Sequence, residues 1–338
     1  MGPIFQSTLV HLSTRIVKAH TGAITACVIR EHSDCTEVIT ASLDKSIATW
    51  RLTQDDDSCL QNIELCRVPV EGGPVFSLAN SIPSIEQRAT NVTPALFCGL
   101  ASKSVVTYNP GDAAVGTKVA LTGHTGWVRA LASDGKWLLS CGCNYLRLWD
   151  ASLAVPKLSH EVKLFTGDIL GIACGGKRVF TAGADGSIRS WRREKGELEE
   201  CAVQEKAHDG RVSSVLLHNG LLYTAGFDGA IKAWSADSLE HAMSVSGVNA
   251  HNGLKVHCLA IGPDQVLYSG GDDQLIRRWH PSTLEQLSDP LSSHTASVRV
   301  ISSGLTETLA SGDSDGSLCI WNIPRAGSCS GVISTFKL

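Results

Sequence analysis

The stretch that decides the fold is 224–234, which reads Thr-Ala-Gly-Phe-Asp-Gly-Ala-Ile-Lys-Ala-Trp and recurs with variations along the chain. A hydroxyl residue, Thr224, stands four positions before Asp228, and Asp228 stands six positions before Trp234. Four other copies keep all three residues at this spacing: Thr40, Asp44 and Trp50; Thr181, Asp185 and Trp191; Ser269, Asp273 and Trp279; and Ser311, Asp315 and Trp321. The chain is therefore built from repeats of one unit.

A histidine followed by a short apolar run precedes most copies, at His20, His208, His251 and His294. Two weaker copies complete the set. One holds His124, Ser140, Asn144 and Trp149, and the other places Cys98, Ser102 and Tyr108 at the hydroxyl, Asp and Trp positions of 96–108. The aromatic residues that end the copies are 58, 41, 42, 43, 45 and 42 positions apart. A period of about 40–45 residues with His, Ser/Thr, Asp and Trp is typical of a four-stranded propeller blade.

The array resembles the WD-repeat (transducin-like) family of seven-bladed β-propellers over nearly the whole chain, although a literal Trp-Asp pair occurs only at Trp149-Asp150. The resemblance implies an all-β fold of seven four-stranded antiparallel blades in one domain, 1–338. The approximate blades are 20–65, 66–118, 119–160, 161–203, 204–246, 247–289 and 290–338.

No blade precedes the strand-like stretch within 5–18, so we expect this N-terminal strand to join the last blade and close the ring. Closure removes free sheet edges. Residues 331–336 could compete for that place or add to it. A polar stretch, 80–94, interrupts the second blade and is expected to be a loop, which leaves open whether it is functional or disordered.

The resemblance also implies a buried hydrogen-bond network in each blade, running from Asp to His to Ser/Thr to the Trp indole. Because an unpaired buried polar group costs about 1–3 kcal/mol, these sets should be complete or absent together. The second blade has lost all of them. In the fourth blade Phe165 replaces the His, so we expect Asp185 to bond to turn backbone or water instead.

The recurring His, Asp and hydroxyl residues do not indicate a catalytic triad, since a catalytic site occurs once in a chain. The sequence has no Walker loop, nucleophile elbow, His-Glu-x-x-His or pair of Cys-x-x-Cys motifs. Cys141-Gly142-Cys143 is interpreted as small residues of the third blade, because no second ligand pair lies near. We therefore expect no catalytic residue, no metal and no cofactor.

The composition of the chain limits which classes of partner and which cellular compartment we expect. The 338 residues are 43% hydrophobic with a net charge of −4, which disfavours general affinity for nucleic acid. Twelve cysteines in so long a chain are too few for a disulfide scaffold, so we expect a reducing compartment, the cytoplasm or another intracellular one such as the nucleus. The sequence shows no membrane span and no secretory signal.

In the resembled family, partners dock around the channel, just before the turn Asp and at the start of each inner strand. Trp, Phe and Arg are enriched in interface hot spots. The candidate partner-binding residues carried over are Trp127, Arg129, Arg211, Phe227, His257, Asp272 and Arg299. Three of these residues are arginines, and their positive charge suggests that the partner is an acidic or phosphorylated peptide.

The sequence therefore predicts a non-catalytic interaction scaffold, a subunit of a hetero-complex with other proteins. Two alternatives remain. A substrate receptor of a cullin-type ubiquitin ligase usually carries Trp-Asp-x-Arg after a blade, and both 149–152 and 321–324 depart from that pattern. An RNA- or ribosome-associated propeller could use the basic stripe Arg189, Arg192, Arg193 and Lys195 around Trp191.

Overall fold

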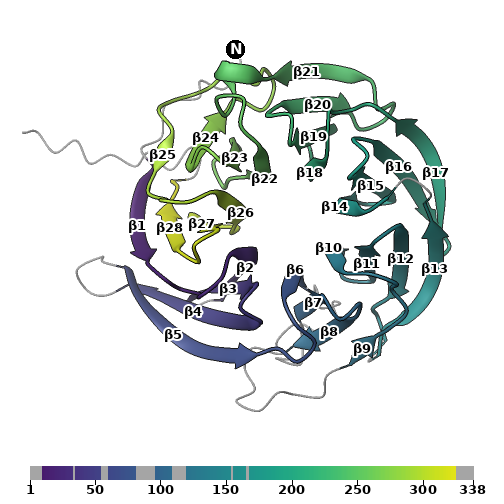
Figure 1. Ribbon diagram of the computed structural model, residues 1–338, viewed down its shortest axis with the longest axis horizontal. Helices are drawn as coiled ribbons and strands as arrows, with labels where there is room; N and C mark the ends of the chain where they lie inside the picture. Colours follow the sequence, from purple (N-terminus) through teal and green to yellow (C-terminus); the bar gives the residue numbers. More distant parts are fainter. Residues whose placement is uncertain are drawn as a thin grey trace, which may run out of the picture.

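The computed structural model is a ring of seven four-stranded antiparallel sheets (Figure 1), described over residues 10–32, 35–54, 60–80, 96–108, 119–153, 155–164 and 167–324. The first three blades, from inner to outer strand, are β2 (Ile24–Glu31), β3 (Thr36–Ser42), β4 (Ser46–Gln54) and β5 (Leu60–Pro69); β6 (Val75–Asn80), β7 (Leu96–Leu100), β8 (Val105–Tyr108) and β9 (Ala120–Leu121); and β10 (Val128–Ser133), β11 (Trp137–Gly142), β12 (Tyr145–Asp150) and β13 (Lys157–Lys163).

The next three blades follow the same order around the ring. They are β14 (Ile169–Gly175), β15 (Arg178–Gly183), β16 (Ile188–Glu194) and β17 (Glu197–Gln204); β18 (Val212–His218), β19 (Leu221–Gly226), β20 (Ile231–Ser235) and β21 (His241–Val245); and β22 (Val256–Ile261), β23 (Leu267–Gly271), β24 (Leu275–Trp279) and β25 (Leu291–Ser292). A single 3-10 turn, η1 (Gly247–Asn249), is the one helical element of the described residues.

The seventh blade takes its outer strand from the other end of the chain. β26 (Val298–Ser303), β27 (Thr308–Asp313) and β28 (Leu318–Asn322) are completed by β1 (His11–Ile16). β1 runs antiparallel to β28, with Ile16 opposite Leu318. Closure by the N-terminal strand is thus confirmed. Of the stretch 80–94 that was expected to be a loop, Asn80 is the last residue of β6, and the rest lies outside the described residues, as does the competing stretch 331–336.

The core is a chain of seven apolar clusters, and each cluster is shared by two neighbouring blades. Between blades seven and one, Ile320 packs with Ile24 and Trp50. Between blades four and five, Phe180 packs with Trp234. The remaining five clusters join the other neighbours in the same way, so each sheet is covered on both faces around the whole ring. Burial on both faces explains why the inner strands are so apolar.

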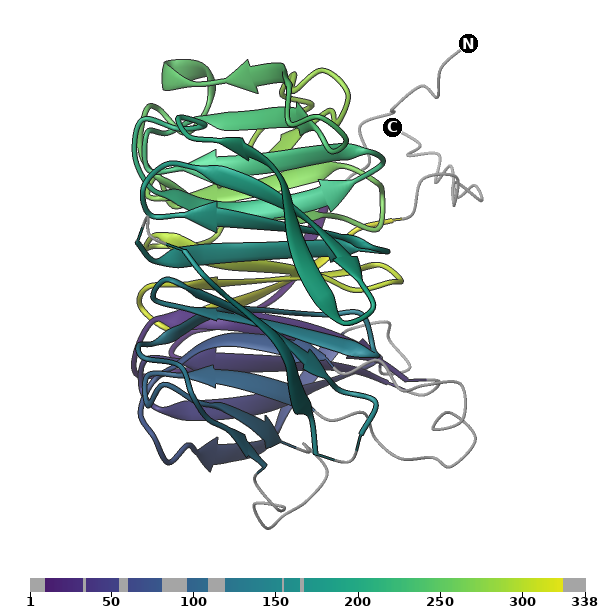
Figure 2. The same ribbon diagram turned by 90° about the vertical axis from the view of Figure 1, so that its right-hand side faces the viewer.

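Each blade enters at its inner strand and proceeds outward (Figure 1). All seven inner strands therefore run in the same direction along the central channel. Their starts therefore gather on one face of the disc and their ends on the other. Seen from the side, turns between strands project on both faces (Figure 2). Among the described residues, no helix is long and apolar enough to cross a membrane.

Candidate functional site

The polar quartet of blade five forms a continuous hydrogen-bond chain. The Trp234 indole N–H donates to Thr224 Oγ1 over 2.9 Å, and Thr224 Oγ1 lies 2.8 Å from His208 Nε2. His208 Nδ1 lies 2.9 Å from the Asp228 carboxylate. Because the hydroxyl accepts from the indole, its own proton goes to Nε2, which leaves Nδ1 protonated to donate to Asp228. One imidazole tautomer therefore satisfies all four side chains.

Blades one and six repeat this geometry. In blade one, His20 lies 2.9 Å from Asp44 and 2.9 Å from Thr40, which accepts from Trp50 over 3.0 Å. In blade six the corresponding distances are 2.7 Å for His251 to Asp273, 2.6 Å for His251 to Ser269 and 2.7 Å for Trp279 to Ser269. In these three blades the structure brings every expected network residue together.

Blade seven corrects the expected network, because Asp313 rather than Asp315 holds the histidine. His294 Nδ1 lies 2.8 Å from Asp313 Oδ2, while Nε2 lies 2.7 Å from Ser311, which accepts from Trp321 over 2.8 Å. Asp313 is fully buried, and Asp315 is exposed. The repeat spacing pointed to Asp315, but a carboxylate two residues earlier occupies the same space.

Blades three and four are incomplete in different ways. His124 Nε2 lies 2.7 Å from Ser140, which accepts from Trp149, yet the described residues place no carboxylate within hydrogen-bonding distance of His124 Nδ1. In blade four Trp191 donates to Thr181 over 3.0 Å. Asp185 accepts from the Ser187 amide and hydroxyl within its own turn, as expected, whereas Phe165 lies outside the described residues.

Blade two replaces the network with Tyr108, which is 8% exposed and contacts the Cys66 thiol at 3.4 Å.

The quartets of the other blades are also closed to solvent. Burial disfavours a charged Asp228, but hydrogen bonds from His208 and from two backbone amides outweigh burial and lower the pKa of Asp228 to about 2. A repeated, buried and internally satisfied set has the properties of a structural element rather than a reaction centre.

A hollow of about 370 Å³ opens where the inner strands start, and we call it the strand-start mouth. It brings together five of the seven predicted partner-binding residues, which come from four blades: Arg129, Arg211, Phe227, His257 and Arg299. The other lining residues are Ala23, Ile24, Thr25, Leu43, Phe76, Leu170 and Ser213. Trp127 and Asp272, the remaining two predicted residues, adjoin it through contacts with lining residues.

One side of this mouth is an aromatic stack. The rings of Phe76 and Trp127 are 5.2 Å apart and nearly parallel, with an interplanar angle of 24°. The Arg129 guanidinium carbon lies 4.9 Å from the Phe76 ring centre and 4.6 Å from the Trp127 ring centre. Cation–π attraction therefore holds Arg129 in place. Trp127 is nevertheless 49% exposed, which is unusual for so large an apolar ring.

The opposite side of the mouth is a group of polar side chains in contact with His257. His257 Nε2 lies 2.6 Å from Asp272, and its Nδ1 lies 3.3 Å from Arg299. Phe227 packs edge-on against His257 with ring centres 5.5 Å apart, and the Lys255 ammonium lies 5.0 Å from the Phe227 ring centre. Burial and the charge of Arg299 lower the pKa of His257 despite the raising effect of Asp272. The cations at this side are thus Arg299 beside the imidazole and Lys255 beside the Phe227 ring.

Phe76 is the residue that the motif analysis missed, because blade two has lost its His, Asp and Trp. The register of the strands places Phe76 directly after buried Val75, as Arg129 follows Val128 and Arg299 follows Val298. The usable signal was therefore the buried aliphatic residue at the start of each inner strand. Counting from it would have placed Phe76 at the mouth.

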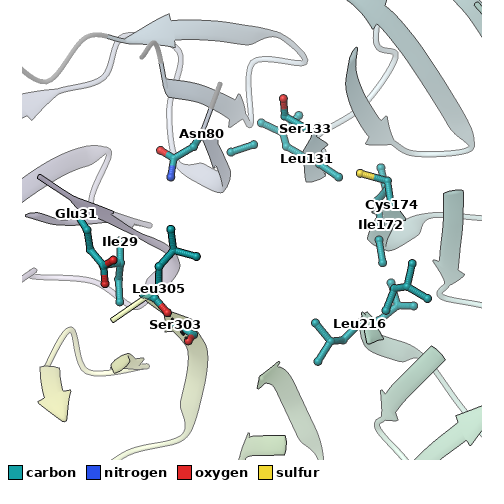
Figure 3. Close-up of a pocket in the computed structure, with 16 residues that line it drawn as sticks. Ile29, Glu31, Asn80, Leu131, Ser133, Ile172, Cys174, Leu216, Ser303 and Leu305 are labelled. Atoms are coloured by element: carbon teal, nitrogen blue, oxygen red, sulfur yellow. Dashed lines mark hydrogen bonds between the residues drawn. The ribbon is translucent and has the colours of Figure 1, made fainter. Parts of the chain in front are cut away.

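A second hollow, of about 540 Å³, lies at the other end of the channel where the inner strands end (Figure 3). Aliphatic side chains from several blades point into it, among them Ile29, Leu131 and Ile172. Its polar members include Glu31 and Cys174, and burial raises the pKa of the Cys174 thiol to about 11. Within the described residues, no group of three or more His, Cys, Asp or Glu could hold a metal ion.

The repeats, the ring and the quartets agree with a family model described as WD domain, G-beta repeat, which matches residues 12–51, 116–150, 243–280 and 285–322. The chain carries WD40 repeats and folds as a seven-bladed β-propeller. A second model, described as IP5P C-F beta-propeller, matches residues 159–256 of this WD-repeat propeller. No curated protein sequence matches it.

Among solved structures, the propeller is similar to the crystal structure of the WD40 beta propeller domain of Doa1. The TM-score is 0.75 with 18% sequence identity, over 93% of this chain and 97% of that one. At such low identity the likeness shows the fold alone.

Proposed function

We propose that this WD-repeat propeller is a non-catalytic scaffold that binds a partner protein at the strand-start mouth, as a subunit of a larger assembly. The observation that supports the proposal is the convergence of Trp127, Phe76 and Phe227 with three arginines at one mouth of the channel. Exposed and half-buried aromatic and arginine side chains gathered around one hollow are the composition of an interface hot spot. These side chains are held on a closed ring, so binding a partner should cost little conformational entropy in the propeller.

The RNA-associated alternative is disfavoured by the basic stripe around Trp191, because its arginines already face carboxylates. Arg189 lies 3.0 Å from Glu200, and Arg192 lies 2.6 Å from Glu199. Arg193 pairs with Asp134. A stripe neutralised in this way offers few free cations to a phosphate backbone. No contact among the described residues supports the cullin-receptor alternative.

The test is a capture experiment with the full chain immobilised in a lysate of the source cells. We expect the bound proteins, identified by mass spectrometry, to fall at least about ten-fold on a Trp127→Ala, Arg129→Ala, Arg211→Ala variant, because truncating several hot-spot residues removes most of the binding energy.

The matched control is Leu305→Ser, which alters the opposite mouth at a residue that is 84% exposed. It should retain the same partners as the unmodified chain. Circular dichroism and thermal unfolding must show that each variant is folded. A folded triple variant that keeps every partner would remove the strand-start mouth from the proposal.

A further inference from the structure

Within the part of the chain that the structure describes, the arginines of the strand-start mouth differ from most others in having no carboxylate within 4.0 Å. Nine arginines of the described residues lie within that distance of an aspartate or glutamate: Arg51, Arg67, Arg147, Arg178, Arg189, Arg192, Arg193, Arg277 and Arg278. Arg129, Arg211 and Arg299 make no such pair with the described residues. In a chain of net charge −4, three unpaired cations at one hollow are a marked local exception.

These three arginines line one hollow from three separate blades. Arg129 comes from the start of β10, Arg211 precedes β18, and Arg299 lies in β26. Arg129 is fixed by the Phe76 and Trp127 rings, and Arg299 is held 3.3 Å from His257. The nearby carboxylate of Asp272 is already engaged with His257 at 2.6 Å. Asp272 offsets part of the charge of Arg299, but three guanidinium groups outnumber this one carboxylate, so net positive charge remains at the mouth.

Such a cluster is suited to an anion with more charge and more acceptor atoms than one carboxylate. A carboxylate has a single charge and two oxygens, which one arginine fork can satisfy. A phosphorylated side chain carries about −1.5 to −2 charge and three strong acceptor oxygens, so several arginines can contact it together. The aromatic stack beside Arg129 provides an apolar surface for the neighbouring residues of the peptide.

From this geometry we infer that the strand-start mouth binds a phosphorylated side chain of its protein partner, through Arg129, Arg211 and Arg299. The inference rests on the proposed function and adds the chemical class of the ligand. Three arginines recognise the phosphate, and the stack of Phe76 and Trp127 receives the side chain next to it.

The test uses degenerate peptide libraries with a fixed central phosphothreonine, threonine or glutamate, passed over the immobilised full chain at physiological salt. We expect the phosphothreonine library to be retained at least about ten-fold more than either of the others. For peptides selected from it, each of Arg129→Gln, Arg211→Gln and Arg299→Gln should raise the Kd measured by fluorescence anisotropy by about ten-fold, as expected for losing a charge-assisted contact.

Arg192→Gln is the matched control, because Arg192 is 53% exposed on the outer part of blade four and already pairs with Glu199. It should leave the Kd unchanged. Three results would overturn the inference: equal retention of the glutamate library, an equal loss of affinity in Arg192→Gln, or displacement of the peptide by a random single-stranded RNA at comparable concentration. The last result would indicate a nucleic-acid ligand.

Phosphatase treatment of the lysate in the capture experiment separates this inference from the proposed function. If treatment abolishes capture and the triple variant loses the same partners, both stand. If partners survive treatment but are lost from the triple variant, the scaffold function stands and the phosphate inference falls. If partners survive on the triple variant, the strand-start mouth is not the docking site.

Discussion

At the residue scale, His124 shows what a missing carboxylate does to a buried histidine. In blades one, five and six an aspartate accepts from Nδ1, whereas Asn144 stands at that position in blade three. His124 is 5% exposed, and its burial, together with the charge of Arg147, lowers its pKa to about 4. This histidine is therefore neutral in the folded protein and charged in the unfolded chain at mildly acidic pH.

We predict that His124 makes the propeller sensitive to acid. Between pH 6.5 and pH 4 the unfolded chain binds a proton at this residue that the folded protein does not, so stability is fully present above pH 6.5 and falls toward pH 4. The loss attributable to this residue is about 3 kcal/mol. Urea unfolding at pH 7 and pH 4.5 should show a smaller loss of stability in His124→Gln than in the unmodified chain. Equal losses in both proteins would contradict the assignment.

At the element scale, the turn between β27 and β28 shows how one backbone position can supply what another normally does. In blade five this position is Gly226, where an added β-carbon would lie 2.5 Å from His208 Nδ1 and 2.6 Å from Asp228 Oδ1. The corresponding residue of blade seven is Asp313, opposite Val298 as Gly226 is opposite Val212. Its side chain therefore points straight at the histidine and takes the place of the usual carboxylate.

Two substitutions in this turn should differ sharply in their effect. Asp313 accepts from His294 and from the amides of Asp315 and Ser317. Asp313→Ala should cost about 3 kcal/mol of unfolding free energy, since it leaves these donors unpaired. Asp315→Ala changes an exposed side chain and should stay within about 0.5 kcal/mol. Urea denaturation of both variants measures the difference, and a larger loss in Asp315→Ala would restore the assignment made from spacing.

At the scale of the whole molecule, the ring depends on one strand supplied from the distant end of the chain. β1 covers the edge of β28, and Arg15 donates to Thr295 Oγ1 over 3.0 Å on the last blade. Ile16 also packs against the cluster shared by blades seven and one. Without β1 the last blade would have three strands and an open edge able to pair with another copy.

A pair of truncations tests this closure. Removing residues 1–16 should lower the unfolding temperature by roughly 10 °C, as expected for a loss of a few kcal/mol in a domain of this size, and should promote self-association. Removing residues 1–9, which stops short of β1, should do neither. Calorimetry and sedimentation velocity measure both effects. A truncated 17–338 chain that stays monomeric and equally stable would show that β1 is dispensable.

The fold was predictable because the signals that specify a blade are local. A turn aspartate, its glycine and the tryptophan ten residues after the hydroxyl lie within one hairpin, so spacing alone identifies them, as at Thr224 and Trp234. The prediction from local spacing was wrong at Asp313, because spacing along the chain does not show which of two nearby carboxylates points inward. The prediction from spacing also missed Phe76, because Phe76 lies in a blade without any motif residue.

By itself, the sequence determined the number of repeats, the all-β class and most of the buried quartets, since each depends on hydrogen bonds made within one blade. Only the tertiary structure decided that Arg129, Arg211 and Arg299 share a single hollow with Phe76 and Phe227. Those residues come from four different blades, and their proximity follows from the parallel course of the inner strands around a closed ring. No spacing along the chain records that geometry, because it arises from how whole blades pack on one another.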